Sequence, residues 1–123
     1  MKTFTLEEAN ALVSQLDQLL EELTGLRDRI IAMGPSLQAM LEHAGGNGGS
    51  QAGGEYVILL QRFNAGLSFF KDIGCELKDL DQGLVDFPSY REDKLVYLCW
   101  KRGEPRIEFW HDLESGFGGR QPL

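Results

Sequence analysis

The sequence is short of basic residues and has no long apolar segment, and each shortage excludes a class of protein. The 12 Lys and Arg residues are outnumbered by 19 Asp and Glu, which gives a net charge of −7 at pH 7. That charge argues against a nucleic-acid-binding protein, because nucleic-acid affinity rests largely on basic residues that neutralise phosphates. It also disfavours an anionic membrane surface. No apolar run reaches the roughly 20 residues that span a bilayer, so we expect neither nucleic acid nor membrane as a partner.

Cysteine is scarce and the common catalytic motifs are absent. Cys75 and Cys99 form no CxxC motif and are too few for a secreted disulfide scaffold. The N-terminal residues turn acidic at once and lack the apolar core of a signal peptide, so we expect a reduced, cytoplasmic protein. No serine has a GxSxG context. The glycine-rich segment 45–54 has no lysine, which excludes a Walker A loop and indicates a flexible connector.

The 123 residues, 42% of them hydrophobic, predict a single soluble domain, 1–123, that begins with a long helix. Thr5 and Glu8 have the spacing of a capping box, and Phe4 precedes them as the apolar residue of a staple. The following apolar residues recur at alternating spacings of three and four, which predicts a coiled-coil-like helix over 1–44. Gly34-Pro35 predicts a kink or a restart within it. The repeat consists of Ala9, Leu12, Leu16, Leu19, Leu23, Leu26, Ile30, Met33, Leu37, Met40 and Ala44.

A shorter return helix is predicted over 55–73, where Gly74 suits the left-handed position that ends a helix. At 1.5 Å per residue the two helices would span roughly 55 Å and 28 Å, so the second covers only half of the first. The leucines at 12, 16, 19 and 23 then need another partner, either the C-terminal sheet or a second copy of the chain. Leucine stripes are usually buried and two-fold dimers are the commonest oligomers, so we expect a homodimer with a helical-bundle interface.

Beyond Gly74 the apolar period changes to two, which predicts three strands over 84–90, 95–101 and 106–112. The expected fold class is therefore α+β, a long helical hairpin followed by a three-stranded antiparallel meander within 74–123. A tight turn at Glu92-Asp93 would place Val85 beside Trp100. A type II′ turn at Gly103-Glu104 would place Leu98 beside Phe109 and Val96 beside His111.

These registers predict one apolar sheet face, against the helices, and one face of mixed chemistry. The mixed face would carry a row of Asp86, Cys99 and Glu108 and, beside it, Tyr97 and Trp110. Carboxylates beside Cys99 would raise the pKa of its thiol and make it a poor nucleophile. The face is interpreted either as a recognition surface or as an outer sheet face half covered by the tail. The candidate binding residues are Asp86, Tyr97, Cys99, Arg106, Glu108 and Trp110.

A divalent metal site is the alternative, centred on His111-Asp112, because histidine is the common neutral metal ligand near pH 7. Adjacent strand residues point to opposite faces, so a structural histidine at the edge of the core is the default interpretation. A Cys–His catalytic pair would require His111 on the face of Cys99, which the predicted register does not give. Carboxylates from the preceding turn would complete a metal site, whose candidate ligands are Glu76, Asp79, Asp81, His111 and Asp112. No other cofactor is expected.

Several segments resemble a known family. They are FTLEEAN at 4–10, ELKDLDQGLVDFP at 76–88, YLCWKRGEP at 97–105, FWHD at 109–112 and GF at 116–117. Together they resemble a small bacterial family catalogued as domain of unknown function 2203, over nearly the whole chain except the glycine linker. The resemblance implies a stand-alone cytoplasmic protein without an established activity, and it assigns no catalytic residue.

From the residues we expect a non-enzymatic homodimer that presents the region 76–120 to a protein partner as an interaction or regulatory module. The competing hypothesis is a protein that binds a small ligand or a metal ion through the residues named above.

Overall fold

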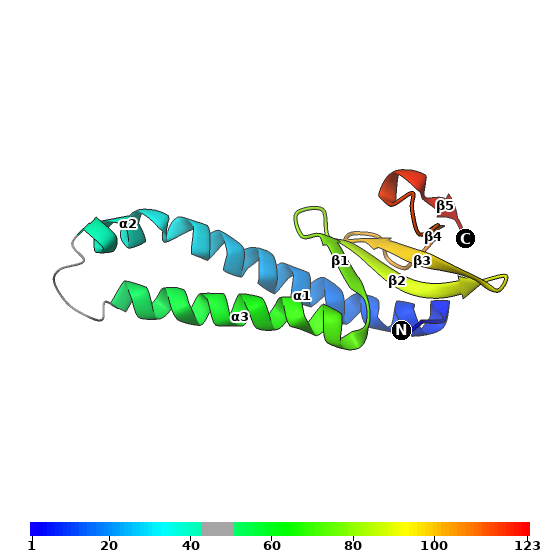
Figure 1. The fold of residues 1–123 in the computed structure, drawn as a ribbon, viewed down its shortest axis with the longest axis horizontal. Coiled ribbons are helices and arrows are strands. Elements are labelled where there is room, and N and C mark those ends of the chain that lie inside the picture. Colours follow the sequence, from blue (N-terminus) through cyan, green and yellow to red (C-terminus); the bar gives the residue numbers. More distant parts are fainter. Residues whose placement is uncertain (43–50) are drawn as a thin grey trace.

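The structure, a computed structural model, describes residues 1–42 and 51–123, and its fold class is α+β as expected (Figure 1). In these residues three helices are followed by a five-stranded sheet, and a short 3₁₀ helix lies between the last two strands. The helices are α1 (Leu6–Ala32), α2 (Gly34–Glu42) and α3 (Gln51–Ile73), and η1 covers Phe117–Gly119. The strands are β1 (Glu76–Asp79), β2 (Leu84–Arg91), β3 (Lys94–Lys101), β4 (Phe109–His111) and β5 (Gln121–Pro122).

The start and the interruption of the first helix follow the sequence. The Thr5 hydroxyl accepts a hydrogen bond from the amide of Glu8, and the Glu8 carboxylate accepts one from the amide of Thr5, so the capping box is present. Helix α1 ends at Ala32, and α2 restarts at Gly34 before Pro35, as Gly34-Pro35 predicted.

The predicted bounds of the connector are partly wrong. Residues 43–50 lie outside the described residues, but Gln51–Gly54, expected in the connector, belong to α3. Glycine costs a helix about 1 kcal/mol relative to alanine, which a long helix tolerates at its end.

The sheet is antiparallel throughout, with the order β1-β2-β3-β4-β5, so the prediction of three strands is wrong. The two missed strands are very short and lie at the sheet edges, where they carry little periodic signal. The β2–β3 register is confirmed, with Val85 opposite Trp100 and Phe87 opposite Leu98. Glu92 and Asp93 both have positive φ angles (51° and 64°), which a type I′ hairpin turn requires.

The predicted register between β3 and β4 is wrong by one residue. Leu98 lies opposite Trp110, Cys99 opposite Phe109 and Tyr97 opposite His111. The expected hairpin at Gly103-Glu104 does not form, and the chain re-enters the sheet only at Phe109.

Hydrogen bonds to Glu104 shape this connection. Its amide donates to the carbonyl of Lys101 (3.0 Å), its carboxylate accepts from the amide of Lys101 (2.7 Å), and its carbonyl accepts from the Trp100 indole (2.9 Å). The amide of Ile107, further along, donates to the Asn10 side chain of α1 (2.7 Å). The one-residue shift in the β3–β4 pairing moves His111 to the outer face of the sheet and Trp110 to the face that meets the helices.

The core lies between the sheet and the two long helices. Leu16, Leu20 and Leu23 of α1 are fully buried and belong to one cluster with Phe70 of α3 and with the inward residues of the sheet. Those sheet residues are Val85, Phe87, Leu98 and Trp100. Figure 1 shows the sheet over the N-terminal half of α1, with the distal half of the helical hairpin projecting beyond it. The sheet and α3 together cover the stripe of Leu12, Leu16, Leu19 and Leu23, because Leu19 and Leu23 lie against Gly66 of α3 and all four belong to the cluster or pack against it. The expectation that the return helix leaves these leucines without a partner is wrong, so the stripe gives no argument for a dimer. Among the described helices, none combines the length and the hydropathy needed to cross a membrane.

Leu20→Ala tests the position of this core. Leu20 is fully buried, so its truncation should lower the free energy of unfolding by about 2–5 kcal/mol. Leu6→Ala is the matched control on the same helix, since Leu6 is 40% exposed and should cost about 1 kcal/mol or less. Urea denaturation of both variants measures the difference, and equal losses would contradict the packing of α1 under the sheet.

Candidate functional site

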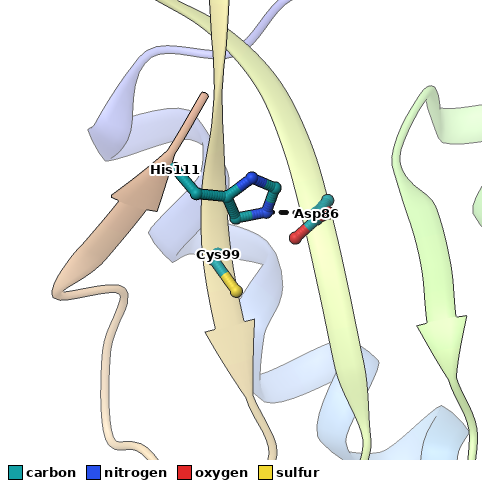
Figure 2. A group of neighbouring side chains, drawn as sticks. All are labelled: Asp86, Cys99 and His111. Atoms are coloured by element: carbon teal, nitrogen blue, oxygen red, sulfur yellow. Dashed lines mark hydrogen bonds and ion pairs between the residues drawn. The ribbon is translucent and has the colours of Figure 1, made fainter. Parts of the chain in front are cut away.

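Three side chains with metal-ligating atoms meet on the outer face of the sheet. Asp86 of β2, Cys99 of β3 and His111 of β4 lie on neighbouring strands, and one ligand atom from each lies within 4.8 Å of the other two. Figure 2 shows the His111 ring extending across β3 toward Asp86, with the Cys99 side chain beside the ring on the same side of the sheet. All three residues are buried, with exposed fractions of 3%, 1% and 2%.

The tail of the chain and the sheet form a cleft at this cluster. A cleft of about 270 Å³ has Asp86 and Cys99 among its lining residues. One wall comes from the sheet and the other from the tail. The remaining lining residues are Lys78, Leu84, Tyr97, Leu113, Glu114, Gly116 and Phe117. The cluster is thus shielded from bulk solvent but still reached by a small cavity.

Arg120 fastens the tail to the sheet. Its guanidinium lies between the rings of Phe109 and Phe117, 4.2 Å and 4.8 Å from their centroids. It also donates hydrogen bonds to the carboxylate of Glu104 (2.6 Å) and to the carbonyl of Cys99 (3.1 Å). Stacking between two rings together with a carboxylate partner is a geometry that arginine supports and lysine does not. The tail therefore has a fixed position over the cluster.

Asp112 forms the turn by which the chain enters the tail. Its carboxylate accepts hydrogen bonds from the amides of Ser115 (2.7 Å) and Glu114 (2.9 Å), and these bonds lower the pKa of Asp112. Its carbonyl lies 2.6 Å from Nδ1 of His111. The same residue thus shapes the tail and orients the histidine ring.

Both ring nitrogens of His111 face oxygen acceptors. Nδ1 lies 2.6 Å from the carbonyl of Asp112, and Nε2 lies 3.0 Å from the carboxylate of Asp86. A neutral imidazole carries one N–H, which can serve only one of these oxygens. The carbonyl accepts and never donates, so Nδ1 carries a proton. The Asp86 carboxyl group faces Nε2, and either a proton between the two atoms or a metal ion at Nε2 satisfies this contact.

The thiol of Cys99 is unsuited to act as a free nucleophile. Burial and, after it, the neighbouring Asp86 carboxylate raise its pKa to about 12, whereas Arg120 acts in the opposite direction. The thiolate is the nucleophilic form, so Cys99 is unreactive at neutral pH unless a cation stabilises its charge. A bound metal ion is such a cation.

The expected binding residues are only partly brought together. Asp86, Tyr97 and Cys99 lie on the outer face as predicted. Arg106 and Glu108 precede β4, pair with each other at 3.3 Å, and lie outside the cluster. The placement of Trp110 on the outer face is wrong, because the register shift turns it toward the core.

The expected metal ligands are dispersed, and His111 groups with different partners. Asp79 accepts a hydrogen bond from the amide of Gln82, Asp81 pairs with Arg27 of α1, and Asp112 forms the tail turn. Glu76 lies opposite Asp86 on β1 and pairs with Lys78. In the described residues the one group of three or more potential metal ligands is Asp86, Cys99 and His111. Each was a candidate in sequence, but the predicted register placed His111 on the opposite face.

Comparison with known proteins gives one match. A family model described as "Uncharacterized conserved protein (DUF2203)" matches residues 2–123. No curated protein and no solved structure matches the chain.

The raised pKa values of the two buried thiols predict how the free energy of unfolding changes at alkaline pH. Burial raises the pKa of Cys75 and Cys99 to about 12, above the value of about 9 in an unfolded chain. The folded state then binds more protons, so the thiol contribution to stability is complete below about pH 9 and is lost as the pH rises toward 12. In metal-free protein, urea denaturation between about pH 8 and 11 should show a shallower decline for Cys75→Ala than for the original chain. Parallel curves would contradict the raised pKa.

Proposed function

The chain belongs to the family of uncharacterised conserved proteins DUF2203, and we propose that it binds a divalent transition-metal ion through Asp86, Cys99 and His111. The three side chains offer one oxygen, one sulfur and one nitrogen. Zn²⁺ accepts this combination of ligands, whereas Mg²⁺ and Ca²⁺ select oxygen ligands alone. Zinc is therefore the first ion to test.

The observation that carries the proposal is the orientation of His111. Metal-bound histidines almost always donate their second ring N–H to a carbonyl or a carboxylate, which fixes the tautomer and aims the other nitrogen at the metal. In this chain Nδ1 faces the carbonyl of Asp112, and Nε2 faces Asp86 on the side where Cys99 lies. This orientation of the ring supports a role of His111 as a metal ligand.

Distances and burial agree with this assignment. Zinc bonds of about 2.0–2.3 Å in tetrahedral geometry place ligand atoms roughly 3.3–3.8 Å apart. The three ligand atoms lie within 4.8 Å of one another, so small side-chain rotations suffice. Three protein ligands leave a fourth position, and the cleft that contains Asp86 and Cys99 in its wall gives that position access to a small molecule or water.

Zinc binding to wild-type and variant chains tests the proposal. The purified full chain should bind one Zn²⁺ by native mass spectrometry, and saturation at 100 times the dissociation constant should raise the free energy of unfolding by about 2.7 kcal/mol. Cys99→Ser preserves the size of the buried side chain and should weaken zinc binding at least about tenfold, the scale of changes near a metal.

Cys75→Ser is the matched control, because Cys75 is the other buried cysteine and lies outside the cluster. It should bind zinc as the original chain does. A chain that binds no zinc, or that loses zinc equally in both serine variants, would refute the metal site.

Self-association is a second candidate function, now supported by a different surface from the leucine stripe. Ile31, Val57 and Ile58 are 66%, 50% and 51% exposed on the helical hairpin. The antiparallel helices approach closely at Leu23 and Gly66, and Ile31 and Ile58 lie equally far from that contact along their helices. Exposed aliphatic side chains at the same level of both helices, on the projecting half of the hairpin, favour a homodimer, which would leave the region 76–120 free for a protein partner.

Light scattering after size-exclusion chromatography tests the dimer. The original chain should show the mass of two copies, and Ile58→Asp should shift it to one copy because the new carboxylate would be buried in the interface. Tyr90→Asp changes an exposed residue at the far hairpin of the sheet and should leave the dimer intact. A monomeric original chain would end this candidate without bearing on the metal site.

A further inference from the structure

A second cleft, separate from the metal ligands, is lined mainly by residues of the N-terminal segment, the end of α3 and strand β1. Its volume is about 580 Å³, within the range of sites that hold small molecules. Two contacts fix its walls. The amide of Phe4 donates to the carbonyl of Pro88 (2.7 Å), and the Lys2 side chain packs on the backbone of Gly74 after α3.

Lysine is concentrated at this cleft. Three of the five lysines in the chain, Lys2, Lys71 and Lys78, are among its lining residues, and Glu76 is the one lining carboxylate. The chain has a net charge of −7, so this local excess of ammonium groups has the opposite sign to the charge of the chain as a whole. The cleft therefore presents a positive potential to a ligand.

These ammonium groups have few ion pairs. Four of the seven arginines, Arg27, Arg102, Arg106 and Arg120, each contact a carboxylate within 4 Å. Within the described residues, Lys2 and Lys71 form no such ion pair, and Lys78 pairs only with Glu76 at 3.5 Å, a contact about half exposed on both sides. The ammonium groups of Lys2 and Lys78 also lie over the rings of Phe4 and Tyr97, at 5.0 Å and 5.8 Å from the centroids, so their contacts are weak ones that an anion can supplement.

The floor of the cleft is apolar. Leu67, Phe70, Leu77 and Pro88 are among its lining residues, and Leu67 is 36% exposed. Tyr97 stands at one side, and burial and the neighbouring Glu76 raise the pKa of its phenol, so its hydroxyl keeps its proton at neutral pH. The site thus combines an apolar floor, cationic groups at its edge and one neutral hydroxyl.

We propose that this cleft binds a small amphipathic carboxylate, with the aliphatic body on the Leu67–Phe70–Leu77 floor and the carboxylate between Lys71 and Lys78. The volume fits a small molecule, and the apolar floor would be unused by a purely acidic peptide. The negative charge of the whole chain opposes docking to an anionic membrane. The inference does not depend on the metal site.

Binding of decanoate, measured by calorimetry on the full chain after EDTA treatment, tests the inference. EDTA removes any metal ion that might itself accept the carboxylate. Decanoate should bind, and decylamine, which has the same chain length and the opposite charge, should not. Amide chemical shifts in NMR spectra should change at Lys71, Gly74, Leu77 and Lys78.

The lysines provide matched variants. Lys71→Gln/Lys78→Gln removes two cleft charges and should raise the dissociation constant of decanoate about tenfold. Lys94→Gln/Lys101→Gln removes the two lysines outside the cleft and should leave it unchanged. Lys71, Lys78 and Lys94 are exposed and Lys101 is half-buried, and equal melting temperatures verify that the variants fold.

Four results would overturn the inference. They are no decanoate binding, equal weakening in both double variants, equal affinity for a short polyglutamate peptide, and binding to phosphatidylglycerol vesicles without binding of monomeric decanoate. Any of them leaves the zinc measurements unaffected, so the two proposals fail separately.

Discussion

The pairing register between β3 and β4 is the constraint on which the candidate site depends. Side chains alternate between the two faces of a strand, so a shift of one residue exchanges the faces of every residue in β4. With Tyr97 opposite His111, the histidine joins Asp86 and Cys99 on the outer face. With the register expected from a tight turn, the same histidine would lie at the edge of the core, and the three ligands would never meet.

That register is held from outside the strand. The hydrogen bonds of Glu104 to Lys101 and Trp100 close the turn, and Asn10 of α1 binds the amide of Ile107. Glu104 also pairs with Arg120, which clamps the tail between two aromatic rings over the cluster. One carboxylate therefore links the turn that sets the register to the tail that buries the ligands. Asp86 and His111 are both buried, and their 3.0 Å contact gives each polar side chain a partner.

The sequence predicted what depends on local signals and missed what depends on distant contacts. The capping box at Thr5 and Glu8 and the β2–β3 register follow from residues close together in the chain, and both are confirmed. The β4 register does not, because Phe109, Trp110 and His111 offer an aromatic ring on either face and the deciding bonds come from Glu104 and Asn10. The burial of the leucine stripe by the sheet and α3 is another long-range outcome, where sequence spacing had offered the sheet or a second chain. The three ligands were all singled out from sequence, but their grouping required the correct register.

X-ray absorption at the zinc edge of the zinc-loaded chain tests the central claim most directly. The account predicts one sulfur neighbour at about 2.3 Å, from Cys99, together with nitrogen and oxygen neighbours at about 2.0–2.1 Å and an imidazole scattering pattern from His111. A first shell of nitrogen and oxygen alone would show that the bound ion lies elsewhere on the protein. It would contradict the grouping of Asp86, Cys99 and His111 into a metal site.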